Sequence, residues 1–234
     1  AYEDINDPMD IKIIHIANAI SAFIIKEWTS FDSPFDDFIN GKTNALTPTQ
    51  KRGMDLFYGK AQCSSCHSGI LFTDQKFYAL AIPQFGPGRT RRMDPYTRDV
   101  GRMGESDNFE DMYKFKTPSL RNVSLTFPYG HNGAYPTLKG IVKHHLNPLQ
   151  MYKNWEPSMA NLPEAKWLEK IDFVVFADKR EQKRLLSRID INPVSIDENE
   201  INELVSFLNS LTGKSRNERP LGKPISVPSG IKVD

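Results

Sequence analysis

The sequence lacks the features that would suit a membrane or a nucleic acid. Its apolar runs are short, and FVVFA at 173–177 is typical, whereas a transmembrane helix needs roughly 20 apolar residues. The formal net charge is only +1, which argues against a nucleic-acid or membrane-surface partner. We therefore expect no membrane span and no nucleic-acid partner. No signal-peptide pattern is visible, and a chain that begins at Ala1 instead of Met suggests a processed or trimmed product.

Cysteine is scarce in this sequence. The sequence has only two, Cys63 and Cys66, and His67 follows directly in the stretch QCSSCHSG. A structural zinc site needs four ligands, and no second CxxC and no HxxxH pair is present to complete one. The scarcity of further ligands therefore disfavours zinc.

A thioredoxin-like redox pair is disfavoured by what precedes the motif. Such a CxxC follows a strand within a βαβ pattern. Here the preceding stretch TPTQKRGMDLFYGK carries helix-start signals instead. Thr47 suits the N-cap, Pro48 suits the first helical position, and Gln50 completes a capping box. The sequence predicts a helix, not a strand, before the cysteines.

The remaining interpretation of CSSCH is a covalent c-type haem. Two thiols at this spacing reach the two vinyl groups of one porphyrin, and the adjacent histidine binds the iron. We predict that Cys63 and Cys66 are thioether anchors, not a disulfide, and that His67 is the proximal iron ligand. One covalent haem c is expected. Haem c is attached outside the cytoplasm, so we expect a periplasmic or equivalent extracytoplasmic location.

Helical periodicity predicts a mostly α chain. The apolar residues of 11–27 recur at helical spacing and predict one buried face: Ile13, Ile16, Ile20, Phe23 and Ile24. His15 lies in the same helix, and we interpret it as a surface or boundary histidine. A last helix is predicted to start at Ser195, with Glu198 completing its capping box and Gly213 ending it. The stretch 118–127 is the one with any alternation, and we expect loop there with at most a short ribbon.

Several segments together resemble one family. They are FDSPFDDFINGKTNALTPTQKRGMDLF, CSSCHSGILFTD, FKTPSLRNVSLTFPYGHNGAYPTLKGIV and ENEINELVSFLNSLTG. These stretches resemble the C-terminal half of the bacterial di-haem cytochrome c peroxidases, a family that includes MauG. The resemblance covers most of the chain, and KTPSLRNVSLTFPY is not a general feature of small cytochromes c. It implies a cytochrome c-like helical haem domain with long loops and little or no sheet.

The resemblance also implies a sixth iron ligand. Family members carry a peroxide-reacting haem in the N-terminal half and a six-coordinate, electron-transferring haem in the C-terminal half. This sequence has one CxxCH and resembles only the second half. In the family the ligand lies fifteen residues past the third position of the PY-x-H-[DN]-G motif, and it is Met in typical peroxidases and Tyr in MauG. That position is Gly130 here, so His145 is the predicted distal ligand.

The neighbour of His145 is the alternative ligand. Adjacent residues of a helix point about 100° apart, so only one of His144 and His145 can face the iron. Met151 is a further candidate if the histidine dissociates. Replacing a thioether with imidazole lowers the reduction potential expected for the haem.

Other residues take roles from the same resemblance. Lys116 and Arg121 are expected as charge partners of the haem propionates. His131 is expected to shape its turn or to contact the haem surroundings without binding iron. Backbone carbonyls of Thr126 and Pro128 are expected to contribute to a structural Ca2+ site whose other protein ligand lies in the N-terminal half.

The expected organisation has three parts. Residues 1–46 form an N-terminal helix and linker that pack on the haem domain, 47–213 form the cytochrome c-like haem domain, and 214–234 form an extended tail. The function expected from the resemblance is the electron-transfer half of a peroxidase or MauG-like oxidoreductase, whose catalytic haem lies outside this chain. Its partners would be a second haem domain or chain and a small periplasmic donor, either a cytochrome or a cupredoxin. A stand-alone mono-haem electron carrier and a single-haem peroxidase are the alternatives.

Overall fold

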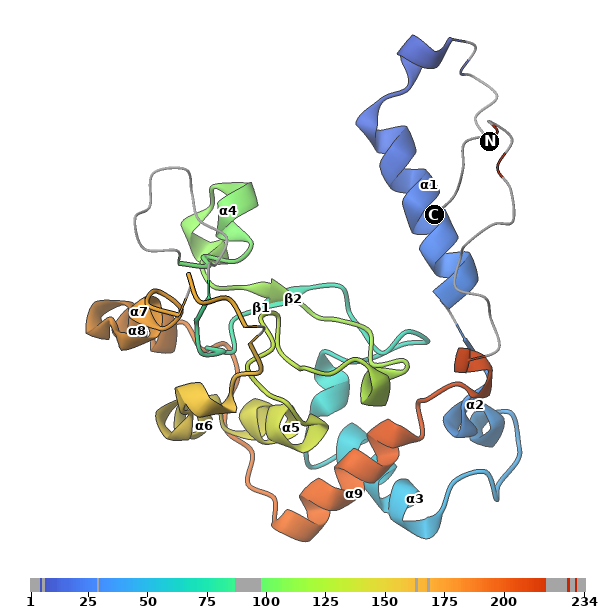
Figure 1. The fold of residues 1–234 in the computed structure, drawn as a ribbon. Coiled ribbons are helices and arrows are strands. Elements are labelled where there is room, and N and C mark those ends of the chain that lie inside the picture. Colours follow the sequence, from blue (N-terminus) through green and yellow to red (C-terminus); the bar gives the residue numbers. More distant parts are fainter. Residues whose placement is uncertain are drawn as a thin grey trace.

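The computed structural model describes residues 5, 7–28, 30–86, 98–162, 164–167, 169–217, 227 and 230. Their regular structure is nearly all helical (Figure 1). The helices are α1 Ile13–Trp28, α2 Pro34–Ile39, α3 Pro48–Tyr58, α4 Met103–Ser106, α5 Leu138–Leu146, α6 Pro148–Asn154, α7 Val174–Ala177, α8 Lys179–Leu186 and α9 Glu198–Asn209.

Sheet is confined, within the described ranges, to one antiparallel ribbon. Strand β1, Phe77–Tyr78, pairs with β2, Phe115–Lys116. Short 3-10 turns complete the fold at Pro8–Asp10, Cys63–Ser65, Phe109–Asp111, Val123–Leu125, Pro157–Met159 and Lys214–Asn217. The predicted fold class, mostly α and cytochrome c-like with little sheet, is confirmed. None of the helices in the described ranges has the length and hydropathy needed to span a bilayer.

Helices α3 and α9 cross at close range and form the framework of the domain. The predicted capping box of α3 is present, since the Gln50 N–H donates to Thr47 Oγ1 and Gln50 Oε1 accepts from the Thr47 N–H. Gly53 allows the close crossing, because a Cβ there would lie 1.9 Å from the carbonyl oxygen of Glu203 on α9. Beside it the Phe57 and Phe207 rings pack with centroids 5.2 Å apart. The close-packed hydrophobic core therefore includes the residues at this crossing.

Helix α9 starts later than the sequence suggests. Asp197, not Ser195, is the N-cap, and its carboxylate accepts from the N–H groups of Asn199 and Glu200. The Glu200 carboxylate accepts from the Asp197 N–H in return, which closes the capping box. Asp and Ser are comparable N-caps, so Ser195 with Glu198 gave a second, equally plausible start. The predicted start at Ser195 is wrong by two residues.

Helix α1 departs from its prediction. It projects away from the rest of the molecule (Figure 1), and the apolar side chains expected to form a buried face are exposed: Ile13, Ile16, Ile20, Phe23 and Ile24. The periodicity identified an apolar helix correctly, but no described segment covers it. The prediction that this helix packs on the haem domain is therefore wrong for the described chain.

The rest of the N-terminal segment does pack on the domain. Phe35 of α2 is buried, with its ring centroid 5.2 Å from that of Phe72 and 5.6 Å from that of Phe207. At the other end, Lys214–Asn217 form a 3-10 turn. Apart from 214–217, 227 and 230, the predicted extended tail at 214–234 lies outside the described residues.

Candidate functional site

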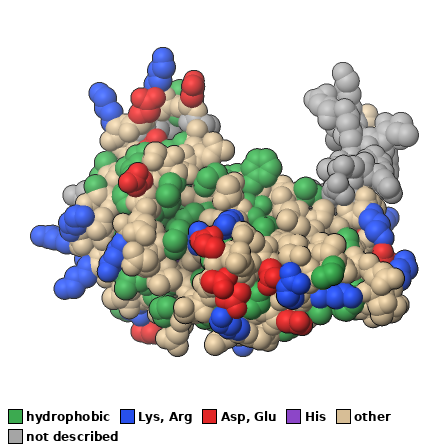
Figure 2. Space-filling view, turned by 90° about the horizontal axis from the view of Figure 1, so that it is seen from below, with side chains coloured by type: hydrophobic (Ala, Val, Ile, Leu, Met, Phe, Trp, Pro, Cys, Tyr) green, Lys and Arg blue, Asp and Glu red, His purple; other side chains and the backbone are tan. Residues whose placement is uncertain are grey.

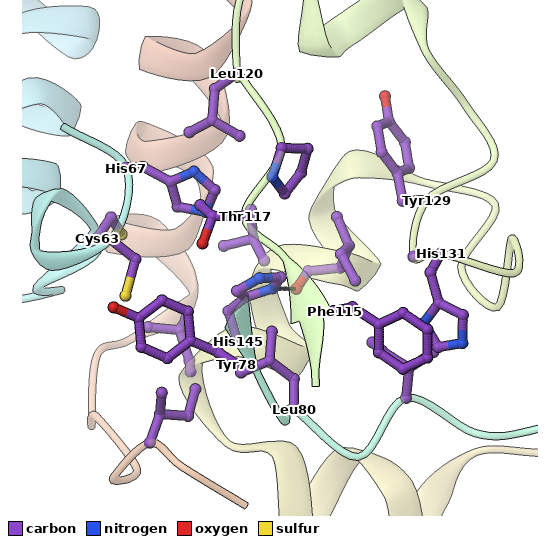
Figure 3. Close-up of a pocket in the computed structure, with 18 of the residues that line it drawn as sticks. Cys63, His67, Tyr78, Leu80, Phe115, Thr117, Leu120, Tyr129, His131 and His145 are labelled. Carbon is purple, nitrogen blue, oxygen red and sulfur yellow. Dashed lines mark hydrogen bonds between the residues drawn. The ribbon is translucent and has the colours of Figure 1, made fainter. Parts of the chain in front are cut away.

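A cavity of about 750 Å3 lies between the CSSCH turn and helix α5 (Figure 3). Its volume is in the range of cofactor and small-molecule pockets. Most of the wall is apolar and comes from segments far apart in the sequence: Phe57, Leu80, Ile82, Leu120, Val123, Ile141, Val142, Leu146, Leu185, Val194, Leu204 and Leu208. The cavity therefore suits a large, mainly apolar group.

The two cysteines line one wall of this cavity. Cys63 opens the 3-10 turn Cys63–Ser65 and Cys66 caps its end, and the His67 N–H donates to the Cys63 carbonyl at 2.9 Å. Both thiols are free. Burial raises the pKa of Cys63 to about 12, so its thiol is protonated at neutral pH and unlike the thiolate of a redox CxxC. The turn presents two unpaired thiols and a histidine to the same space.

The His67 ring is oriented by a hydrogen bond at Nδ1, which leaves Nε2 for a metal ion. Its Nδ1 lies 3.1 Å from the Phe72 carbonyl oxygen, which can only accept, so the proton sits on Nδ1. Burial, with a smaller contribution from His145, lowers the pKa of His67 to about 4. The neutral ring therefore has a lone pair on Nε2, which is the arrangement usual for a metal-bound histidine.

His145 lies across the cavity in the same protonation state. Helix α5 carries it in the last turn, and its Nδ1 donates to the Ile141 carbonyl at 2.9 Å. Burial lowers its pKa as well. Its Nε2 also has a lone pair, and both rings border the cavity (Figure 3).

The separation of these two rings fits a shared metal ion. The centroids of His67 and His145 are 6.2 Å apart. An imidazole nitrogen binds a transition metal at about 2 Å, and the ring centre lies about 1 Å behind it, so two imidazoles on opposite sides of one ion have centres about 6 Å apart. With the two thiols beside His67 and the apolar wall around both rings, the residues present fit a c-type haem.

His144 points the other way and is fully committed to the protein. It is 0% exposed, and its Nε2 donates to the Leu80 carbonyl at 2.6 Å. Its Nδ1 therefore accepts from the Tyr135 hydroxyl at 2.7 Å. Neither nitrogen is available to a metal, and His144 does not line the cavity. Met151, the other alternative ligand, is not a lining residue either.

Arg121 does not take the role predicted for it. Its guanidinium forms a two-point ion pair with the Asp36 carboxylate, at 3.0 Å each, and also donates to the carbonyls of Ser30 and Ile70. The two side chains are 7% and 5% exposed, and Arg121 is absent from the cavity wall. The buried Asp36 carboxylate neutralises the positive charge of Arg121, so Arg121 is a structural residue. Lys116 does line the cavity, and its proposed contact with a propionate stays a prediction.

His131 lies on the far wall of the cavity. Its ring is stacked on Phe115 (Figure 3), with centroids 3.5 Å apart and planes 9° apart. Its Nε2 is 3.9 Å from the Asp99 carboxylate. Burial lowers its pKa to about 4. The stacked ring forms part of the wall, as expected for a residue that shapes the surroundings. Thr126 and Pro128 also border the cavity.

A calcium site stays a prediction. Among the described side chains, no group of three or more His, Cys, Asp or Glu is arranged to hold a metal ion. The expected ligands at Thr126 and Pro128 are backbone carbonyls, which calcium accepts.

One buried polar pair beside the cavity was missed. The Tyr113 hydroxyl donates to the Glu181 carboxylate at 2.5 Å, and the two side chains are 1% and 2% exposed. Tyr113 lines the cavity, and Glu181 lies on α8. Burial, then the hydrogen bond to Glu181, raises the pKa of Tyr113. The partners are 68 residues apart, and neither belongs to a motif that would have linked them.

The chain is similar in sequence to several cytochrome c peroxidases and MauG proteins, although no model of a known protein family matches it. It is 41% identical over 128 residues to the cytochrome-c peroxidase IdrP1 of Pseudomonas sp. (strain SCT), covering 47% of this chain and 34% of the relative. It is 40% identical over 130 residues to the cytochrome c peroxidase Ccp of Escherichia coli K12, covering 55% and 26%. It is 30% identical over 148 residues to the methylamine utilization protein MauG of Methylophilus methylotrophus, covering 62% and 40%. The chain spans well under half the length of these relatives.

Solved structures give the same result. A MauG-like protein associated with microbial copper homeostasis matches with a TM-score of 0.58 and 25% identity, over 94% of this chain and 62% of that one. The fold is also shared with the diheme peroxidase BthA from Burkholderia thailandensis E264, with a TM-score of 0.54 and 23% identity, over 88% and 51%. The names of these relatives imply a c-type haem, which is the group that the cavity fits. In sequence and in fold, the chain is similar to parts of bacterial cytochrome c peroxidases, MauG proteins and a diheme peroxidase.

Proposed function

We propose that this chain is the electron-transfer haem domain of a cytochrome c peroxidase-like or MauG-like oxidoreductase. It would hold one haem c through thioether bonds to Cys63 and Cys66, with His67 and His145 as the two axial ligands. The observation that carries the proposal is the 6.2 Å separation of two neutral imidazoles across the cavity. A bound c-type haem supplies a one-electron Fe(III)/Fe(II) couple.

The two histidines decide which chemistry the site favours. Because both Nδ1 atoms are held by backbone carbonyls, both rings keep an Nε2 lone pair, and both rings line the cavity. If His67 and His145 both held the haem iron, no ligand position on it would be left for peroxide. The apolar wall excludes water, and imidazole in place of a thioether lowers the reduction potential. This arrangement supports electron transfer and leaves peroxide chemistry to a second haem.

The remaining parts of the proposal come from the family. The peroxide-reactive haem would belong to a second haem domain or chain. Electrons would arrive from a small periplasmic cytochrome or cupredoxin, and the location would be periplasmic. Ca2+ held partly by the carbonyls of Thr126 and Pro128 would complete the site next to that second domain. A stand-alone mono-haem carrier is the second candidate, because the closed axial set of His67 and His145 serves it equally well.

Spectroscopy of the haem-loaded chain tests the axial ligands. We expect ferric EPR and visible spectra of a purely low-spin, bis-nitrogen centre that does not change when peroxide is added. In His145→Ala this signal is lost, and added imidazole restores it by filling the vacated space. His144→Gln is the matched control, and it keeps the low-spin signal without imidazole.

Two outcomes would contradict the proposal. A high-spin signal in the unaltered chain that changes with peroxide would make this haem the reaction site. Loss of the low-spin signal in His144→Gln but not in His145→Ala would exchange the roles of the two histidines. An additional CxxCH upstream in the same coding sequence would favour the peroxidase half over the stand-alone carrier.

A further inference from the structure

Helix α8 borders the cavity through Leu185 and has two distinct faces. On its inner face Leu185 is 3% exposed and lines the cavity, and Glu181 is 2% exposed. The Glu181 carboxylate accepts from the Tyr113 hydroxyl and pairs with Arg98 at 3.4 Å. This inner face is fixed by packing and by buried hydrogen bonds.

The outer face carries only positive charge. Lys179, Arg180, Lys183 and Arg184 are all exposed, and we call these four residues the basic face of α8. The one carboxylate within the helix, Glu181, is buried on the other side. Figure 2 shows Lys and Arg side chains gathered at the end of the molecule where α7 and α8 lie in Figure 1.

This concentration of charge is unlike the surface around α9, where each of three glutamates has a basic partner. Glu198 pairs with Lys139 and Lys143, Glu200 with Lys60, and Glu203 with Arg52. On α8, by contrast, neither Arg180 nor Lys183 forms an ion pair with a described residue. Since the formal net charge of the whole chain is only +1, four basic side chains on one helix face form a local excess of positive charge.

The basic face also lies close to the cavity. Leu185 touches the cavity from the inner side of the same helix whose outer side carries Lys183 and Arg184. An α-helix with its side chains is about 10–12 Å across. A protein bound to the basic face is therefore separated from the cavity by about one helix diameter.

We propose that the basic face of α8 docks a small electron-transfer protein whose own contact surface is acidic. This proposal rests on the function proposed above and specifies the chemistry of the electron donor. One electron would leave the reduced partner, which would be oxidised by one unit, and would reduce the ferric haem that His67 and His145 would hold in the cavity behind Leu185. No bond forms or breaks, and no proton has to be transferred.

Charge of one sign on a docking face acts mainly on the association rate. Opposite charge on the partner steers the encounter, and salt weakens the effect because the Debye length is about 8 Å at physiological ionic strength. Arg184 pairs with Glu181 at 3.5 Å, but Arg180 and Lys183 have no ion pair with a described residue to lose when an acidic partner arrives. Transient binding of this kind suits an electron carrier, which must leave after each transfer.

The test uses the haem-loaded chain and a reduced acidic cupredoxin as the probe. The test variant is Arg180→Glu/Lys183→Glu. The control is Lys12→Glu/Lys51→Glu, which makes the same change in net charge just before α1 and on α3, far from α8 (Figure 1). Two quantities are measured against ionic strength: the association rate, by stopped flow, and the sites of zero-length carbodiimide cross-links between lysines and the carboxylates of the probe.

We expect the test variant to lower the association rate at least about tenfold at low salt, and the control to change it less than about twofold. In the unaltered chain, the cross-links to the probe should form at Lys179 and Lys183. Equal losses in both variants, or cross-links mainly at other lysines, would overturn the proposal. So would equal association with a basic cytochrome c, or equal binding of the chain to anionic lipid vesicles in place of the probe.

The readouts keep this proposal separate from the axial-ligand proposal. The test variant changes only exposed side chains, so its low-spin spectrum should match that of the unaltered chain. If the spectrum shows a high-spin iron while the cross-links still map to Lys179 and Lys183, the axial assignment fails and the docking surface stands. A low-spin spectrum with unchanged association rates gives the reverse result.

Discussion

The α3–α9 framework and the cavity beside it are built on opposite rules. At the framework, Gly53 lets two backbones meet, and Phe57 and Phe207 fill the remaining space. Across the cavity, the His67 and His145 rings face one another over a space of about 750 Å3. One region is completed by its own side chains, and the other is completed only by a group that the chain does not encode.

This difference determines how each region responds to change. In the framework a single added carbon has no place to go, because protein interiors are packed as densely as organic crystals. In the cavity a side chain can be removed with little loss of packing, but the chemistry changes. Substitutions in the framework should therefore appear as lost stability, and substitutions at the cavity as altered spectra.

The largest effect is expected at Gly53. In Gly53→Ala the new Cβ would lie 1.9 Å from the Glu203 carbonyl oxygen and 2.9 Å from Phe207 Cβ, so α3 and α9 must separate. We expect a loss of about 4 kcal/mol or more in the free energy of unfolding, above the range usual for overpacking because the clash is with backbone. Denaturant unfolding of the haem-loaded chain measures it.

Gly104→Ala is the matched control. Gly104 lies in α4, and an added Cβ would meet nothing closer than Val100 at 3.7 Å. The substitution should be neutral or stabilising by up to about 1 kcal/mol, because alanine favours a helix. Equal stability of the two variants would show that the framework is more adaptable than its packing indicates.

A somewhat smaller effect is expected at Asp36, which lies on α2 and forms a buried ion pair with Arg121. Asp36→Asn removes the charge that neutralises Arg121, whose guanidinium stacks on Phe31 and lies near Phe72. Leaving one partner of a buried ion pair uncompensated costs about 3 kcal/mol. Equilibrium unfolding of the variant at pH 7 gives this loss.

The loss should depend on pH. Burial raises the pKa of Asp36, but hydrogen bonds from Arg121 and Ser33 outweigh it, and the net pKa is lowered. The contribution is therefore complete above the ordinary aspartate value of about 4 and is lost as the pH falls through the lower native value. The stabilities of Asp36→Asn and the unaltered chain should converge in acid. A difference that stays constant with pH would show that Asp36 does not carry the effect through its charge.

The sequence predicted the local features of both regions better than the long-range ones. The Thr47 capping box and the CSSCH turn are short-range patterns, and both lie where they were expected. For α1, periodicity identified the apolar residues but could not say what covers them. For Arg121, the resemblance suggested a haem propionate as the charge partner, whereas the partner found, Asp36, lies 85 residues away in the sequence.

The two adjacent histidines show the same division within one helix. His145 was selected by resemblance and faces the cavity, while His144 was kept as an alternative because nothing in the sequence shows its surroundings. The structure distinguishes them by their bonds: His144 joins Tyr135 to the Leu80 carbonyl, and His145 bonds only within its own helix. In this comparison His144 belongs with the framework and His145 with the cavity.

The smallest of the three effects follows from that assignment. His144→Ala leaves the Tyr135 hydroxyl and the Leu80 carbonyl buried without their partner, which costs about 2 kcal/mol of unfolding free energy. Thermal and denaturant unfolding of the haem-loaded chain should show this loss while the visible spectrum of the folded protein stays unchanged. His15→Ala, which removes an imidazole from α1, should cost under about 0.5 kcal/mol. If His144→Ala were as stable as His15→Ala, the bonds of His144 would contribute nothing to the fold, and the two neighbouring histidines would no longer differ in kind.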